Sequence, residues 1–300
     1  EAVDTYLALG ALFRRTGDLS RAVRLHRNML LGPALGEGRR AEVERELAED
    51  YRRSGMLAEA AELYGRLASA GDRVAAEGLR DVLAEGGNLR GAVEVQRGLA
   101  PGGPDPLLAH LLAALARDAR ARDPAAARQA ARGAAAADPA SADALLALAE
   151  VGGAEDGLAA AARALEADPR SALLAGPALD AAPDPAAALA LVEERLARTP
   201  ADAGLHLLRG RALARLGRGA DAAAALRRAL DLDERGDAAL ALREWLGDPA
   251  APRLDLADRH ALLLAAVRRR AHPVVCARCG SEAPARAWRC RRCGAFDAFP

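Results

Sequence analysis

A glycine turn followed at a fixed distance by an alanine recurs along the N-terminal third of the chain. The turns Thr16-Gly17-Asp18, Ser54-Gly55 and Gly86-Gly87-Asn88 precede Ala22, Ala60 and Ala92, and these alanines are 38 and 32 residues apart. Each alanine begins the apolar face of a predicted second helix. A period near 34 residues is typical of stacked antiparallel helix pairs, because one pair cannot bury its apolar face alone. The sequence therefore predicts a helical repeat array.

The first two units show the expected inner faces most clearly. In the first unit the two faces are Leu9, Gly10 and Phe13, then Ala22, Leu25 and Met29; in the second they are Leu47, Ala48 and Tyr51, then Ala60, Tyr64 and Leu67. Later units are marked by their ends at Asp138-Pro139, Asp168-Pro169 and Thr199-Pro200, since proline disfavours helical geometry in the residue before it. We expect about seven helix pairs, the last clear one spanning Gly210 to Ala229.

Composition agrees with an all-α fold of the tetratricopeptide-repeat (TPR) type. Hydrophobic residues make up 51% of the chain but aromatic residues only 3%, and strands would need β-branched and aromatic side chains. We predict a TPR solenoid over residues 1–236, a linker and terminal helices over 237–272, and a small metal-binding module over 273–300. Within the second segment, 248–258 is the linker, and a short helix runs from Arg259 to Arg270. An irregular alanine-rich helical domain is the alternative.

The overall charge limits the kind of partner. Lys+Arg and Asp+Glu each number 42, so the chain lacks the basic excess with which a general nucleic-acid binder neutralises phosphates. The longest strongly apolar stretch, Ala261 to Val267, is far shorter than the roughly 20 residues of a membrane-spanning helix. No glycine-rich phosphate loop and no nucleophile motif is visible, so we do not expect an enzyme.

Two cysteine pairs near the C-terminus carry the strongest chemical signal. Cys276-x2-Cys279-Gly280 and Cys290-x2-Cys293-Gly294 contain all four cysteines of the chain. Two residues between thiolates let both sulfurs reach one tetrahedral ion at about 2.3 Å, and a four-sulfur shell leaves no position open for catalysis. We therefore predict one structural metal ion, iron or zinc, held by Cys276, Cys279, Cys290 and Cys293.

Arginines and aromatic residues surround these cysteines. Four thiolates on a divalent ion leave a negative charge, which we expect the neighbouring arginines to compensate: Arg278, Arg286, Arg289, Arg291 and Arg292. Trp288, Phe296 and Phe299 are predicted to form the small core of the module. Two alternatives stay open, namely a disulfide or redox-active pair and an arginine-rich zinc ribbon that binds nucleic acid.

Longer motifs resemble a known family. They are Leu7-Ala8-Leu9-Gly10-x-Leu12-Phe13-Arg14-Arg15-x-Gly17-Asp18-x-x-Arg21-Ala22-Val23-Arg24-Leu25-His26-x-Asn28, Glu49-Asp50-Tyr51-x-x-Ser54-Gly55-Met56, and the two cysteine pairs with Trp288 before the second. Together they resemble the lipopolysaccharide assembly protein B family, in which TPR repeats precede a rubredoxin-like module. Arg291 and Ser281 depart from the proline and the aromatic residue usual in that family, which leaves iron versus zinc open.

The resemblance implies a function that the residues alone do not. It implies a non-enzymatic adaptor that links the lipid A deacetylase to a membrane-bound AAA+ protease and so regulates lipopolysaccharide synthesis. It also implies an N-terminal membrane anchor, preceding Glu1, that holds the repeats on the cytoplasmic face of the bacterial inner membrane. A generic TPR assembly scaffold and a nucleic-acid-binding repeat protein are the alternatives.

Charged residues on the first helix of a TPR unit are candidates for partner contact. By their position in the repeat we expect Arg14, Arg15, Glu49, Arg52 and Arg53 to project toward the groove where partners dock, with solvated surface charges as the alternative. His26 is expected to be a buried, hydrogen-bonded histidine rather than a ligand or a base.

Overall fold

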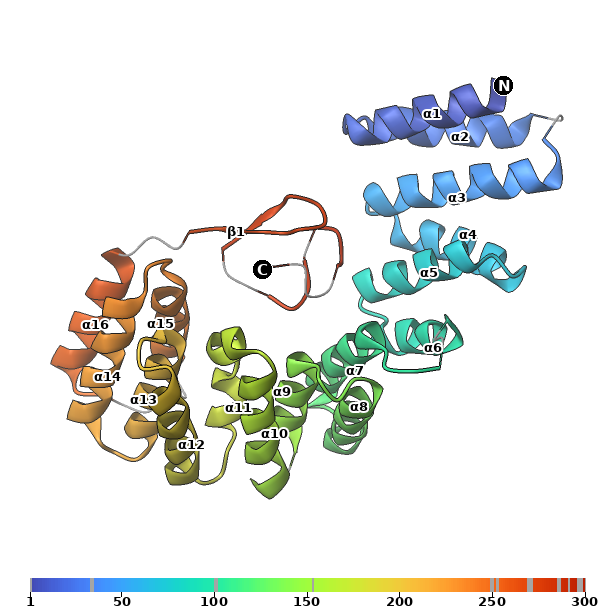
Figure 1. Cartoon of the computed structure of the whole chain (residues 1–300). Coiled ribbons are helices and arrows are strands. Elements are labelled where there is room, and N and C mark those ends of the chain that lie inside the picture. Colours follow the sequence, from blue (N-terminus) through green and yellow to red (C-terminus); the bar gives the residue numbers. More distant parts are fainter. Residues whose placement is uncertain are drawn as a thin grey trace. The chain divides into compact units, whose positions relative to one another are not determined.

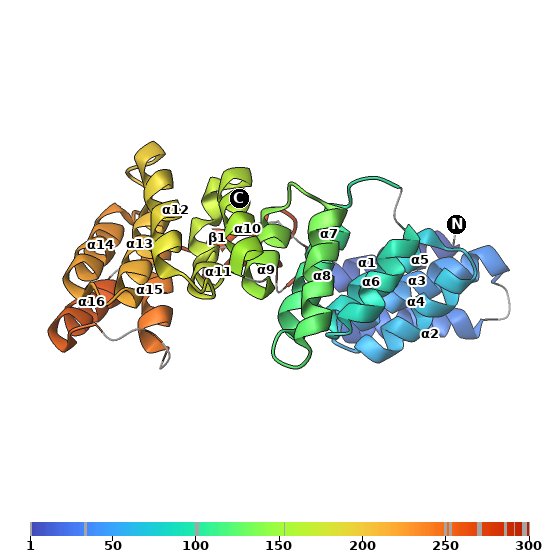
Figure 2. The same ribbon diagram turned by 90° about the horizontal axis from the view of Figure 1, so that it is seen from below.

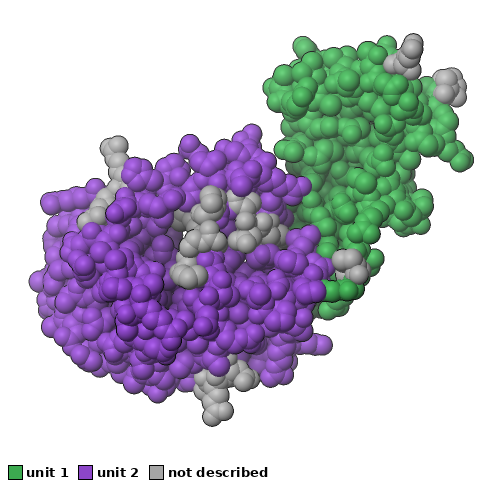
Figure 3. All heavy atoms as spheres, in the orientation of Figure 1, with its two compact units in different colours: residues 1–103 green, residues 104–300 purple. Residues whose placement is uncertain are grey.

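The computed structural model describes residues 2–32, 35–99, 102–152, 154–248, 251, 254–268, 272–284, 287–290, 292–295 and 299. The chain divides into two compact units, Glu1–Gly103 and Pro104–Pro300, which Figure 3 colours green and purple. Each unit is described by itself.

Unit 1 consists of three consecutive helix pairs (Figure 1). The pairs are α1 (Ala2–Arg15) with α2 (Leu19–Leu31), α3 (Glu37–Arg53) with α4 (Leu57–Ser69), and α5 (Arg73–Glu85) with α6 (Leu89–Leu99). The predicted turns separate the two helices of each pair, and Gly17, Gly55 and Gly87 adopt φ values of 84°, 78° and 82°. These left-handed conformations end the first helix of each pair and favour glycine because it has no Cβ.

The predicted alanines are buried where the second helices pack. Ala22, Ala60 and Ala92 are each 0% exposed, five residues after the turn glycine, and Ala222 repeats this relation to Gly217 in unit 2. A side chain this small lets the two helices of a pair approach closely. The periodicity seen in the sequence therefore marks the real contact surfaces of the repeats, and the predicted all-α TPR fold is confirmed.

A second recurring position explains the glycines inside the first helices. Gly10 faces His26, and Gly210 faces Leu226, each pair separated by 16 residues. A Cβ on Gly10 would lie 2.3 Å from His26 Nε2, and one on Gly210 would lie 2.5 Å from Leu226 Cγ. The glycine makes room for a large side chain on the paired helix. In the third pair the same spacing joins Arg80 to Gln96 through a hydrogen bond of 2.9 Å.

Unit 2 continues the alternation of helices (Figures 1 and 2). Its helices are α7 (Pro106–Ala119), α8 (Pro124–Ala137), α9 (Ala142–Val151), α10 (Ala154–Ala167), the 3₁₀ helix η1 (Pro169–Leu174), α11 (Gly176–Asp180), α12 (Pro185–Arg198), α13 (Ala203–Arg215), α14 (Gly219–Leu232), α15 (Asp237–Gly247) and α16 (Leu256–Arg268). Asp105, Asp123 and Asp184 cap the helices that begin with proline, each accepting a backbone N–H.

The degenerate middle of the array has a local cause. α10 ends at Ala167, as the Asp168-Pro169 signal predicts, but η1 and the five-residue α11 then replace a full-length helix. Pro177 fixes the start of α11, and Pro183 follows its end within three residues. Through α14 the described chain forms seven pairs, matching the predicted number.

The C-terminal helices differ in part from the expectation. α16 begins at Leu256, three residues before the predicted start at Arg259, because Asp255 Oδ2 accepts the N–H of Ala257 at 3.0 Å. α16 packs on α14 and α15, and its Leu262 and Ala266 are buried with Leu242 and Trp245 of α15. Arg270 and the linker prolines Pro249 and Pro252 lie outside the described residues.

Within the described ranges, none of the helices combines the length and the apolar character that crossing a lipid bilayer requires.

Two glycine-to-alanine substitutions should change stability in opposite directions. Gly210→Ala forces a Cβ against the fully buried Leu226, and overpacking of this kind costs about 1–3 kcal/mol. Gly65→Ala lies inside α4 with no atom within 4 Å of the added Cβ, so it should gain about 1 kcal/mol of helix propensity. Thermal unfolding followed by circular dichroism should show a lower midpoint for the first variant and a higher one for the second. Equal shifts would contradict the close approach of α13 and α14.

Candidate metal centre

The C-terminal module is built from two cysteine turns and a short hairpin. Strand β1 (Val274–Val275) pairs antiparallel with β2 (Glu282–Ala283), so that Val274 lies opposite Ala283. This hairpin carries the first cysteine turn between its strands. The described residues contain no other strand, in agreement with the small irregular module that the sequence predicts.

The two cysteine turns have the same backbone hydrogen bonds. In the first, Gly280 donates its N–H to the Cys276 carbonyl and Cys276 donates to the Ser281 carbonyl, both at 2.9 Å. In the second, Gly294 donates to the Cys290 carbonyl and Cys290 donates to the Ala295 carbonyl, at 2.9 and 2.8 Å. Gly280 and Gly294 have φ values of 67° and 70°, which explains a glycine after each pair of cysteines.

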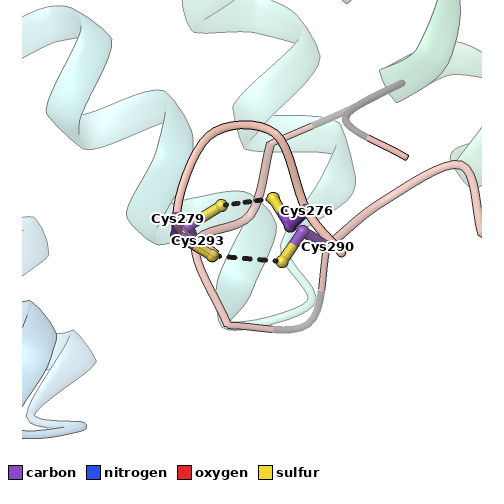
Figure 4. Close-up of side chains that lie close together, drawn as sticks. All are labelled: Cys276, Cys279, Cys290 and Cys293. Atoms are coloured by element: carbon purple, nitrogen blue, oxygen red, sulfur yellow. Dashed lines mark hydrogen bonds between the residues drawn. The ribbon is translucent and has the colours of Figure 1, made fainter. Parts of the chain in front are cut away.

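The four sulfurs face one another across a small space (Figure 4). All lie within 4.8 Å of one another, and the Cys276–Cys293 and Cys279–Cys290 sulfurs are 3.7 Å apart. A regular tetrahedron of about 2.3 Å metal–sulfur bonds places its ligands about 3.8 Å apart. The four cysteines are free thiols rather than disulfides. The cluster can therefore hold one structural metal ion, with iron and zinc both compatible.

Hydrogen bonds and burial set the protonation of the cluster. The Ser281 hydroxyl, 3.1 Å from the Cys279 sulfur, lowers the pKa of that thiol. Burial raises the pKa of Cys290, but hydrogen bonds from Ser281 and from the backbone N–H groups of Cys293 and Arg292 outweigh it, and the pKa falls to about 6. Burial raises the pKa of Cys293 to about 12. Full deprotonation of the cluster therefore needs a cation, which a divalent metal supplies.

The predicted aromatic core of the module is wrong in one residue. Phe299 is buried among Val274, Cys276, Cys290 and Ala295, as expected. Trp288 instead packs against the apolar cluster of the repeats, and its ring lies 6.0 Å from the ring of His110 on α7. Phe296 lies outside the described residues.

The arginines near the cysteines differ in what they contact. Arg289 is half-buried, and its Nε donates to the Gly294 carbonyl at 3.3 Å, which supports the second cysteine turn. Arg278 and Arg292 are exposed. Arg286 and Arg291, also expected to compensate the metal–thiolate charge, lie outside the described residues.

The module is seated on the repeats of unit 2. The Trp288 ring packs near His110 of α7. The His272 N–H donates to the Arg235 carbonyl at 2.7 Å, next to the start of α15. In Figure 1 the module lies inside the curve formed by α7 to α16. A tryptophan in a module this small anchors it to a larger apolar surface, since the module alone has little core.

Buried aspartates link neighbouring repeats on both sides of the chain division. In unit 1, Asp50 of α3 binds His26 Nδ1 and Arg14, each at 2.6 Å. In unit 2, Asp143 of α9 binds His110 Nδ1 at 2.6 Å and Arg117 at 2.7 Å. The prediction of a buried, hydrogen-bonded His26 is confirmed.

Sequence reasoning missed the network around Asp143. The repeat pattern could have predicted this network, because it has the same composition as the network around Asp50. Arg14 also binds Glu46 of α3, and Arg117 also binds Glu150 of α9. In each network the arginine and the carboxylates are about one repeat apart in the sequence. The two oxygens of a single aspartate, Asp50 or Asp143, bind the histidine and the arginine.

The five candidate partner-binding residues fall into two groups. Arg14 binds Glu46 and Asp50, and Arg52 binds Glu85 and Asp81 of α5. Burial alone would lower the pKa of Arg14 and of Arg52, but these carboxylates raise it in both cases. Glu49 is half-buried and pairs with Arg52 and Arg53 of its own helix.

Arg15 and Arg53 are exposed. The ion pair of Arg53 with Glu49 is local, and no ion pair of Arg15 is found among the described residues. Arg14 is therefore not the exposed charge that the sequence suggested, whereas Arg15 and Arg53 are available to a partner.

Comparison with known proteins identifies the C-terminal domain. Residues 275–300 match the family model Zn_ribbon_LapB, described as a rubredoxin metal binding domain. These residues are therefore similar to the metal-binding domain of lipopolysaccharide assembly protein B. The resemblance to this family that the sequence motifs predict is thereby confirmed over this domain. A comparison with curated proteins gave no match.

Several solved structures are similar to this chain at low sequence identity. A tetratricopeptide repeat protein from Parabacteroides merdae has 17% identity and a TM-score of 0.46, covering 89% of this chain and 99% of its own. Yeast Tom70 has 12% identity and a TM-score of 0.34, covering 89% of this chain and 69% of its own. The Naa15/Naa10 complex bound to HypK-THB has 18% identity and a TM-score of 0.38, covering 84% of this chain and 49% of its own.

Removal of one sulfur should unfold the module and leave the repeats helical. Cys290→Ser should retain far less metal than the unaltered chain, and limited proteolysis should cut it within 273–300, because metal binding supplies much of the folding free energy of so small a module. Far-ultraviolet circular dichroism should change little, since the helices have their own buried cores.

The matched control is Ser281→Ala, which removes a hydroxyl beside two sulfurs but no sulfur. It should retain one metal ion per chain by elemental analysis. A Cys290→Ser chain with full metal content and an intact C-terminus would contradict the four-sulfur site.

Proposed function

We propose that the chain is a non-enzymatic adaptor that regulates lipopolysaccharide synthesis by linking the lipid A deacetylase to a membrane-bound AAA+ protease. The observation that carries the proposal is the match of residues 275–300 to the metal-binding domain of lipopolysaccharide assembly protein B, at the end of a TPR array. Repeats of this kind offer extended surfaces to other proteins, which suits an adaptor.

The proposed partners require a place at the membrane. We propose that the protein works on the cytoplasmic face of the bacterial inner membrane, held there by an N-terminal anchor preceding Glu1. The support is the family resemblance, because the protease is membrane-bound and an adaptor must reach it. Expression of the full-length gene product followed by membrane fractionation tests this: the protein should sediment with the inner membrane, and recovery in the soluble fraction would contradict it.

Binding of the deacetylase should depend on the exposed arginines of unit 1. Arg15→Glu with Arg53→Glu reverses two exposed charges and breaks only the local Arg53–Glu49 pair, so stability should change by about 1 kcal/mol. Pull-down of the purified deacetylase should fall at least tenfold. The control is Arg218→Glu with Asp221→Arg, which swaps an exposed ion pair of unit 2. Unchanged binding by the Arg15/Arg53 variant would place the contact elsewhere.

Loss of the adaptor should slow degradation of the deacetylase. In cells that lack the gene, the half-life of the deacetylase should lengthen, and the unaltered gene should restore it. Cys290→Ser should fail to restore it if the module takes part in the link. An unchanged half-life in the deletion strain would favour the alternative, a TPR scaffold with other partners.

A further inference from the structure

A cleft in unit 2 lies between the metal module and the last repeats. Its volume is about 1020 Å³. One wall comes from η1 and from the N-terminal parts of α13 and α15, and the other from β1, β2 and the second cysteine turn. The backbone hydrogen bond from His272 to Arg235 ties the two walls together at one end.

Apolar side chains form much of the cleft surface. Leu173, Leu174 and Leu240 line the repeat wall, and Val274, Ala287 and Phe299 line the module wall. The three leucines are half-buried, so the cleft offers them to a ligand in part. A volume and lining of this kind suit a few side chains of a peptide.

The charged residues of the cleft are mainly acidic. Six carboxylates line it, namely Asp202, Asp233, Glu234, Asp237, Glu244 and Glu282, against three arginines, Arg235, Arg289 and Arg292. Asp202 and Asp233 already accept backbone N–H groups at the starts of α13 and α15. Glu234, Glu244 and Glu282 are exposed, and no ion pair of theirs is found among the described residues.

Asp237 carries an unsatisfied hydrogen-bond acceptor in the cleft wall. Its Oδ2 pairs with Arg235 at 3.3 Å, but its buried Oδ1 has no hydrogen-bond partner among the described residues. Burial, together with the neighbouring Asp233, raises the pKa of Asp237. A buried acceptor without a donor costs free energy, and Asp237 therefore adds an incompletely compensated carboxylate to the acidic wall of the cleft.

We propose that this cleft binds a protein partner through a peptide segment that carries basic side chains next to apolar ones. The unpaired glutamates receive the basic groups, and the leucines receive the apolar side chains. The same acidic surface disfavours nucleic acid, phospholipid headgroups and acidic peptides, because like charges repel. The site is separate from the arginines of unit 1, and it does not depend on the identity of the deacetylase or the protease.

Labelled peptides test the proposal on the metal-loaded full chain. The probes are three fluorescein-labelled twelve-residue peptides: one with three lysines and three leucines, one with three glutamates and three leucines, and one with three lysines and three serines. Fluorescence anisotropy should show saturable binding of the lysine–leucine peptide, at least tenfold tighter than either of the others. Equal binding of the glutamate peptide, or no binding of the lysine–leucine peptide, would overturn the proposal.

Charge reversal on the repeat wall locates the binding. Glu234→Lys with Glu244→Lys should weaken the lysine–leucine peptide at least tenfold, and metal content should stay unchanged because neither residue belongs to the module. The matched control is Glu94→Lys, an exposed glutamate of α6 in unit 1. Equal weakening by the control would show unspecific attraction and overturn the site. So would self-association of the chain that the double variant abolishes, since a second copy would then be the occupant.

Discussion

Close approach of paired helices is the constraint on which the rest of this structure depends. Ala22, Ala60, Ala92 and Ala222, each five residues after a turn glycine, are fully buried, and Gly10 and Gly210 of the facing helices leave room for one large side chain each. The core can therefore be built almost wholly from alanine and leucine, as the low aromatic content requires. Dispersion contacts between closely packed helices replace the area that large rings would otherwise bury.

Buried ion networks determine which helices of neighbouring repeats pack against each other. Asp50 and Asp143 are almost fully buried, and each binds one histidine and one arginine across neighbouring repeats. Removing one member of such a network is costly because the other charges stay buried without partners. The networks therefore fix which helices stack. They also explain why Arg14, which has the sequence position of a groove residue, serves the fold.

Much of the fold followed from local sequence patterns, because turn glycines, proline stops and helical periodicity each act within a few residues. The cysteine turns followed for the same reason, since metal–sulfur geometry fixes their spacing. The predictions that were wrong or incomplete involve contacts between distant segments. Trp288 was assigned to the module core together with Phe296 and Phe299, but it packs against the apolar cluster of the repeats and lies near His110 on α7. The early start of α16 depends on the Asp255 cap, which the proline-rich linker obscured.

The module contacts α7 and the residue before α15, and these contacts connect the metal site to the repeats. The acidic cleft lies between the module and the repeats. Hydrogen exchange of the full chain, with and without a chelator, tests this account most directly. Chelation should raise exchange in 273–295 and also at the start of α15 and in α7 around His110, while α1 to α6 of unit 1 stay protected. Exchange that rises only within the module, or equally throughout unit 1, would contradict a metal-held module seated on these two helices.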